Sequence, residues 1–91
     1  MIEYHYILSG KVQGVGFRYF VKEKADNLDI KGWTKNTYDG KVEILTQSKD
    51  EKTEQEFEDY LQIGPSMSKV EKIKKEKNEN ISKKFKDFQI I

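Results

Sequence analysis

Three glycines and an arginine crowd into one ten-residue stretch of the chain, SGKVQGVGFR at residues 9–18. Gly10, Gly14 and Gly16 are three of the six glycines in the sequence, and Arg18 is its only arginine. Glycine lets the main chain turn tightly and bring unhindered N–H groups up to a ligand, and a helix that begins there turns its positive end the same way. The stretch therefore predicts an anion site, with phosphate as the expected ligand.

Other known phosphate motifs do not fit this stretch. A Walker loop needs Gly-Lys-Ser/Thr, which does not follow here, and a dinucleotide fingerprint needs a third glycine where the sequence has Tyr19. Arg18 considered alone could also be an ordinary solvent-exposed helix residue, as most charged helix residues are. His5 lacks the Ser or carboxylate partner of a catalytic triad, so we expect it to point outward from a strand.

Hydrophobic periodicity predicts the elements that position the glycines. Apolar residues alternate over residues 2–8, with Ile2, Tyr4, Tyr6 and Leu8 on the expected core face, and recur at helical spacing after the glycines. Ser48 and Glu51 fit the capping box of a second helix. The expected strands are residues 2–8, 30–36, 41–47, 70–76 and 85–90, and the expected helices are residues 17–28 and the segment from the cap at Ser48 to Gly64.

This order of elements predicts an α+β fold, a ferredoxin-like βαββαβ sandwich with both helices on one face of an antiparallel sheet and a short C-terminal strand. In that fold the first two strands run parallel with the third between them. Their carboxyl ends share one edge of the sheet, so Asn36 is expected about 10 Å from the glycines, two strand spacings away. Arg18 at the start of the first helix could reach across most of that gap. We therefore expect a glycine-rich loop, a guanidinium and a neutral amide in one shallow site.

Composition limits the functions open to the chain. Its 91 residues predict one domain, residues 1–91, and a net charge of +1 gives no general reason to expect a nucleic acid or an anionic membrane as partner. Without cysteine, and with one histidine, thiol catalysis is excluded and we expect no metal site or other cofactor. No apolar run predicts a membrane span and no N-terminal pattern predicts a secretory signal, so we expect a cytoplasmic protein. We expect a monomer.

The sequence is also similar to a known family. GKVQGVGFR followed by GWTKNTYDGKVE, with IGPSMSKVEKI downstream and an FQI segment near the end, closely resembles the acylphosphatase family over essentially the whole chain. The resemblance implies a metal-free hydrolase that cleaves an acyl phosphate to a carboxylate and inorganic phosphate. Thr34 stands where the family usually has valine, Lys11 where arginine is common, and Ile90-Ile91 where an aromatic residue is frequent.

The resemblance also implies roles for particular residues. Arg18 would bind the phosphoryl group, and Asn36 would position the attacking water. The backbone of residues 11–17, which we call the glycine loop, would supply further N–H donors. The loop consists of Lys11, Val12, Gln13, Gly14, Val15, Gly16 and Phe17.

Two other functions remain open on the sequence. The same fold could bind a phosphorylated ligand or carbamoyl phosphate without catalysis, although an intact Arg18 and Asn36 favour hydrolysis. A ferredoxin-like RNA-binding domain would need aromatic residues on a central strand and a basic sheet face, and the third strand, KVEILTQ, has neither. We therefore expect a small-molecule acyl phosphate as substrate.

Overall fold

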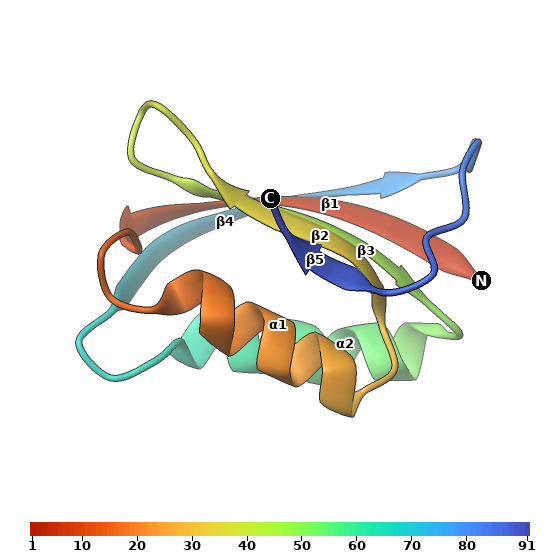
Figure 1. Cartoon of the computed structure of the whole chain (residues 1–91), viewed down its shortest axis with the longest axis horizontal. Coiled ribbons are helices and arrows are strands. Elements are labelled where there is room, and N and C mark those ends of the chain that lie inside the picture. Colours follow the sequence, from red (N-terminus) through yellow and green to blue (C-terminus); the bar gives the residue numbers. More distant parts are fainter.

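A computed structural model describes all residues from Met1 to Ile91, in the order β1-α1-β2-β3-α2-β4-β5 (Figure 1). This is the predicted order of strands and helices. The strands are β1 (Ile2–Lys11), β2 (Lys31–Asn36), β3 (Val42–Ser48), β4 (Lys69–Asn78) and β5 (Phe88–Ile90), and the helices are α1 (Phe17–Asn27) and α2 (Glu51–Ile63).

The five strands form one sheet in the order β4-β1-β3-β2-β5. β3 pairs antiparallel with both β1 and β2, so β1 and β2 run parallel on either side of it, as predicted. The prediction of an antiparallel sheet holds for these strands and β4 but not for β5, which pairs parallel with β2. The last residue of β4 pairs with Glu3 of β1, at the end of the sheet where β2 also begins. A chain that passes from this end to the far edge of the sheet therefore runs along that edge in the same direction as β2.

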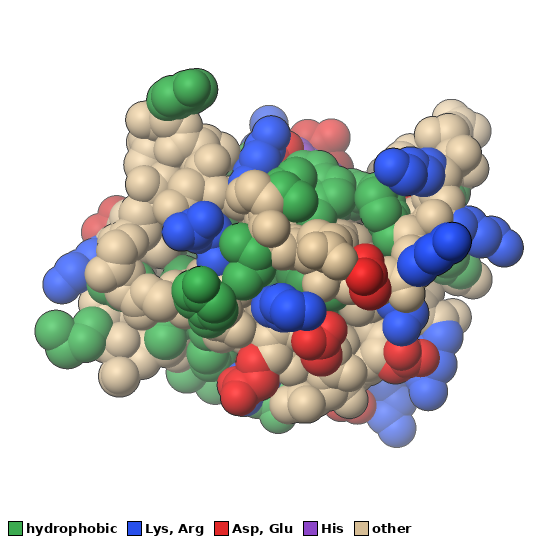
Figure 2. Space-filling view, viewed as in Figure 1, with side chains coloured by type: hydrophobic (Ala, Val, Ile, Leu, Met, Phe, Trp, Pro, Cys, Tyr) green, Lys and Arg blue, Asp and Glu red, His purple; other side chains and the backbone are tan.

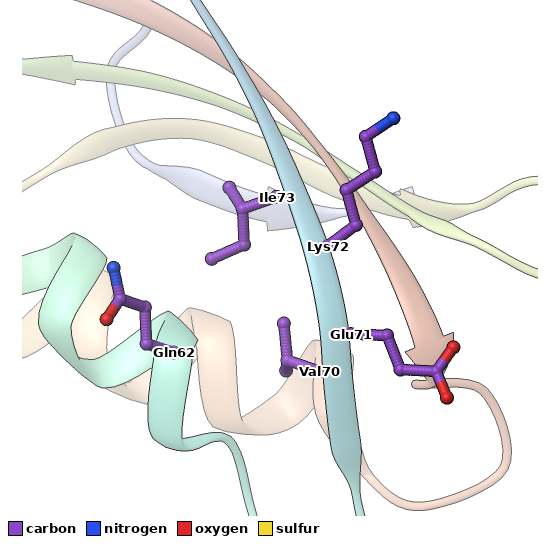
Figure 3. A pocket seen from close by; sticks show the side chains of 5 residues that line it. All are labelled: Gln62, Val70, Glu71, Lys72 and Ile73. Carbon is purple, nitrogen blue, oxygen red and sulfur yellow. The ribbon is translucent and has the colours of Figure 1, made fainter.

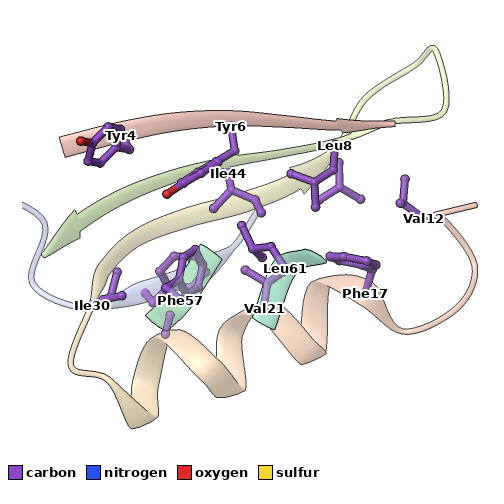
Figure 4. Packing of buried hydrophobic residues seen from close by; sticks show 13 residues of the cluster. Tyr4, Tyr6, Leu8, Val12, Phe17, Val21, Ile30, Ile44, Phe57 and Leu61 are labelled. Carbon is purple, nitrogen blue, oxygen red and sulfur yellow. The ribbon is translucent and has the colours of Figure 1, made fainter. Parts of the chain in front are cut away.

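Both helices cover the same face of the sheet, and the hydrophobic core lies between the two layers (Figures 1 and 4). The predicted core face of β1 is buried, because Tyr4, Tyr6 and Leu8 point toward the helices. Each large apolar side chain buried in this way contributes about 1.5–3 kcal/mol to stability. From the helices, the core takes Phe17, Val21, Ala25, Phe57 and Leu61. This layer fixes α1, and with it the start of the candidate site.

The start of α2 differs from the capping-box prediction. The N-cap is Asp50, whose side chain accepts a hydrogen bond of 2.8 Å from the backbone N–H of Thr53. Ser48 instead ends β3, because it still pairs with Ile2 of β1. Its hydroxyl donates to Glu54, at 2.8 Å. The strand therefore continues further than the sequence pattern indicated, and the cap lies two residues later.

Glu54 is a charged side chain of α2 that lies fully inside the protein. It accepts hydrogen bonds from Tyr6 and Ser48, and from Thr46 at 2.7 Å. Burial, followed by the neighbouring Glu54 charge, raises the pKa of Tyr6 above its usual range. A buried carboxylate is tolerated here because three hydroxyl groups replace its water.

Strand ends also differ from the prediction. β1 continues past Leu8 to Lys11, because Ser9, Gly10 and Lys11 pair with β4 across a bulge. Gly10 has a φ of 126°, and a Cβ there would lie 2.2 Å from the carbonyl oxygen of Lys69. The first of the three clustered glycines therefore serves strand pairing. β4 is longer than predicted, and β5 begins at Phe88 instead of residue 85.

Candidate active site

The register of the sheet brings the glycine loop and Asn36 to the same end of the molecule. Val42 of β3 pairs with Leu8 of β1 on one side and with Asn36 of β2 on the other. In Figure 1 the loop that follows β1 and the hairpin that joins β2 to β3 both lie at the left of the view. The predicted meeting of these segments at one sheet edge is confirmed.

Residues 12–16 of the glycine loop link β1 to α1 in an irregular conformation. Gly14 and Gly16 have φ angles of 73° and 76°, in the left-handed region that costs other residues energy. A Cβ at either position would meet no atom within 4 Å. The two glycines are therefore required by the backbone conformation, and not by lack of space.

The loop leaves backbone donors without partners. No backbone N–H group of residues 12–16 donates a hydrogen bond within the protein. Gly16 caps α1 with no side-chain hydrogen bond, and the first turn of the helix contains no acidic residue. The first N–H groups of a helix have no intrahelical acceptor and carry partial positive charge. This end of α1 is therefore electrostatically suited to an anion.

A pocket of about 120 Å³ lies between the loop, α1 and the end of β2. It brings Arg18 of α1 and Asn36 of β2 together, from positions far apart in the sequence. The side chain of Arg18 forms no ion pair or hydrogen bond within the protein, whereas the nearby Lys35 and Lys41 are paired with Glu43 and Asp39. The pocket is lined by Val12, Gly14, Gly16, Phe17, Arg18, Tyr19 and Asn36.

Asn36 contains the one buried side-chain polar atom in the protein that has no hydrogen-bond partner, its Oδ1. Leaving a buried acceptor unsatisfied costs about 1–3 kcal/mol, so such an atom in a stable fold calls for an explanation. The carbonyl oxygen of an amide can accept a hydrogen bond from water. An acceptor of this kind beside an unpaired guanidinium gives the pocket one group suited to an anion and one suited to a water molecule.

The other residues of the glycine loop have different positions. Lys11 is exposed at the end of β1, and Val15 is half-buried against the core. Neither lines the pocket. Gln13 turns its side chain away to the β2–β3 hairpin, where Nε2 donates hydrogen bonds of 2.8 Å to the carbonyl oxygens of Thr37 and Lys41. No sequence pattern predicts this contact, beyond a long polar side chain in a loop expected beside the hairpin.

A larger hollow of about 350 Å³ lies between α2 and β4. Its polar side chains do not converge, because Glu71 and Lys72 point in different directions from Gln62 (Figure 3). The remaining lining residues, Val70 and Ile73, point toward the helices. Binding sites combine an apolar wall with convergent polar groups. The smaller pocket at the glycine loop meets that condition better, and we take it as the candidate active site.

Comparison with known proteins gives consistent matches. The model of the Acylphosphatase family matches residues 4–90. An acylphosphatase of Borrelia garinii subsp. bavariensis is 42% identical over 91 residues, covering 99% of this chain and 98% of that protein. The crystal structure of acylphosphatase from Bacillus subtilis is similar with a TM-score of 0.94 and 40% identity, covering 100% of this chain and 99% of that one.

A similar fold also occurs within a much longer protein. The crystal structure of T. kodakarensis HypF matches all of this chain with a TM-score of 0.84 and 30% identity, but the match covers 12% of the HypF chain. The Borrelia and Bacillus proteins match from end to end. The family match includes the glycine loop, Arg18 and Asn36. The chain therefore belongs to the acylphosphatase family of acyl phosphate hydrolases.

Proposed function

We propose that this enzyme hydrolyses acyl phosphates by in-line attack of a water molecule that Asn36 positions, on a phosphoryl group that Arg18 and the glycine loop hold. The observation that carries the proposal is the buried, unpartnered Oδ1 of Asn36 in the same pocket as the unpaired Arg18. A fold that retains both groups without internal partners reserves them for molecules from outside.

Arg18 has the geometry that phosphoryl transfer requires. A guanidinium donates two parallel N–H bonds to phosphoryl oxygens, which the single ammonium of a lysine does not reproduce. The free N–H groups of the loop and of the first turn of α1 add further donors. In a loose transition state negative charge spreads over the equatorial oxygens, where preorganised donors lower the barrier most.

Asn36 supplies position instead of basicity. Its Oδ1 accepts a hydrogen bond from the attacking water and so holds the water oxygen toward phosphorus. The new P–O bond forms as the bond from phosphorus to the acyl oxygen breaks. The electron pair of that bond leaves on a carboxylate, which needs no general acid, and the proton of the water passes to a phosphate oxygen. The products are a carboxylate and inorganic phosphate.

The reaction written in this way needs no metal or organic cofactor, and we propose that the enzyme works without one. We also propose that residues 1–91 form a single domain that acts as a cytoplasmic monomer on a small acyl phosphate. The absence of cysteine fits a reducing compartment. Neither helix is long and apolar enough to cross a membrane. A net charge of +1 gives no general reason to expect a nucleic acid, although Lys and Arg side chains gather toward the right end of the view in Figure 2, with Asp and Glu side chains beside them.

The test is release of inorganic phosphate from benzoyl phosphate, with p-nitrophenyl phosphate as the matched monoester and with EDTA in a parallel reaction. We expect turnover of the acyl phosphate, with and without EDTA, and none of the monoester, whose leaving group is poorer. Tight binding of phosphate without turnover would instead support a non-catalytic binding module. Loss of turnover in EDTA would contradict the metal-free mechanism.

A further inference from the structure

The candidate pocket is small compared with sites that enclose a whole ligand. The pocket has a volume of about 120 Å³, whereas sites that enclose a whole small-molecule ligand have roughly 300–1,000 Å³. Arg18, the loop and Asn36 all serve the phosphoryl end. A bulky acyl group such as benzoyl therefore extends past the opening, where it meets the side chains that stand there.

One residue that lines the pocket has a large side chain that is mostly exposed. Val12 and Phe17 line the pocket but are 1% and 2% exposed, since they belong to the core. Gly14 and Gly16 contribute no side chain. Tyr19 is 73% exposed while lining the same pocket. It is therefore the lining residue whose apolar surface an acyl group can cover.

Tyr19 has no other structural task. Its hydroxyl group takes part in no hydrogen bond, and its ring takes part in no aromatic or cation–π pair, unlike Phe17 and Phe20 beside it on α1. It follows Arg18 directly in the first turn of α1, whereas Asn36 comes from β2. In an in-line reaction the leaving group departs on the side opposite the water, away from Asn36. Tyr19 lines the pocket from α1, a different element from the one that carries the group proposed to hold the water.

We propose that Tyr19 determines specificity toward the acyl group, contacting it with its ring and favouring planar aromatic acyl phosphates over acetyl phosphate. The inference rests on the proposed function, because it takes the phosphoryl group to be held by Arg18 and the loop. Aromatic rings attract one another in offset or edge-to-face arrangements, beyond the apolar area that they bury. Acetyl phosphate offers the ring only a methyl group.

The experiment compares kcat/KM for benzoyl phosphate and acetyl phosphate in the wild type, Tyr19→Ala, Tyr19→Phe and Tyr38→Ala. We expect Tyr19→Ala to lower kcat/KM for benzoyl phosphate about three- to tenfold, the size of one aromatic pair, and to change that for acetyl phosphate less than about twofold. Tyr19→Phe should behave as the wild type, since the ring makes the contact. Tyr38 is another exposed tyrosine but does not line the pocket, so Tyr38→Ala should leave both values unchanged.

The possible outcomes distinguish a failure of this inference from a failure of the proposed function. If the wild type hydrolyses both substrates and Tyr19→Ala changes them equally or not at all, Tyr19 does not contact the acyl group and only this inference fails. If the wild type hydrolyses neither, the proposed function fails and the inference with it. Because Tyr19 is exposed, we expect Tyr19→Ala to fold as the wild type does. Circular dichroism checks the fold, and the inhibition constant for inorganic phosphate checks the pocket.

Discussion

Gln13 Nε2 donates a 2.8 Å hydrogen bond to the carbonyl oxygen of Thr37, the residue that directly follows Asn36 in the chain. A second bond of 2.8 Å reaches the carbonyl oxygen of Lys41 across the same hairpin. The glycine loop is thereby tied to the segment that presents Asn36. The distance between the loop N–H groups and the Asn36 amide therefore depends on this one side chain as well as on the sheet.

Replacing Gln13 with methionine, which has similar length but no N–H donor, removes both bonds and retains the bulk. We expect the free energy of unfolding to fall by about 1–3 kcal/mol and kcat to fall more than phosphate affinity, since the loop keeps its donors but loses its register with Asn36. Urea unfolding and steady-state kinetics measure these effects. Gln55→Met, at an exposed site where the amide bonds only to Asp59, is the control. If phosphate affinity and kcat fell equally, the result would contradict the idea that Gln13 holds the loop in place relative to Asn36.

Arg18→Lys and Arg18→Ala test the proposed phosphoryl contact. Both changes should lower kcat/KM with benzoyl phosphate at least about 100-fold, the scale of losing one preorganised donor, because an ammonium cannot form the paired bonds. Since Arg18 has no partner in the protein, stability should change little. Lys52→Ala, which removes an exposed helix cation elsewhere, should keep full activity. Unchanged turnover in Arg18→Ala would remove the guanidinium from the mechanism.

The glycines of the motif should separate into structural and functional positions. Alanine at Gly10 would place Cβ 2.2 Å from a carbonyl oxygen of β4, whereas alanine at Gly16 meets only the cost of a left-handed φ, about 1–2 kcal/mol. We therefore expect Gly10→Ala to be the less stable protein in urea. Per folded molecule, Gly16→Ala should have the lower kcat/KM, because it disturbs the donors beside Arg18. A lower kcat/KM for Gly10→Ala than for Gly16→Ala would contradict the placement of the anion site beside Gly16.

Much of the fold and the location of the site follow from the sequence, because periodicity fixes which residues are buried and the order of elements fixes which strand ends meet. The order of elements thereby brings Asn36 and Arg18 to the same pocket. Contacts between distant side chains carry no such periodicity. The bonds from Gln13 to the hairpin, and from Tyr6 and Thr46 to the buried Glu54, depend on tertiary packing that no local pattern expresses.

The cap of α2 illustrates the same limit on a smaller scale. Ser48 and Glu51 have the right spacing for a capping box, and Asp50 has an equally suitable side chain. Pairing of Ser48 with Ile2 keeps it in the sheet and decides between them. Similarly, β5 takes a parallel direction because of where β4 ends, a fact about the whole sheet and not about residues 88–90.

Protonation of Asp50 should account for part of the loss in the free energy of unfolding at acid pH. The backbone N–H and then the side chain of Thr53 hold the pKa of this carboxyl below its ordinary value of 3.8. A lowered pKa in the folded state means that the ionised form is favoured by folding, so its contribution is complete above pH 3.8 and is lost as pH falls through the lower native value. Asp50→Asn keeps a capping oxygen but cannot ionise. The stability difference between wild type and Asp50→Asn, measured in urea from pH 7 downward, should shrink below pH 4, and a constant difference would contradict this account.

Asn36→Ala is expected to separate binding from hydrolysis. The variant removes the oxygen that positions water but leaves Arg18 and the loop donors, so inorganic phosphate should inhibit with a constant within about twofold of the wild type while kcat falls about 100-fold. It also removes a buried acceptor that has no partner, and the free energy of unfolding should therefore stay constant or rise by up to about 1 kcal/mol. Kinetics, phosphate inhibition and urea unfolding on one preparation test all three. Loss of phosphate binding with retained turnover would show that Asn36 belongs to the anion site and that another group positions the water.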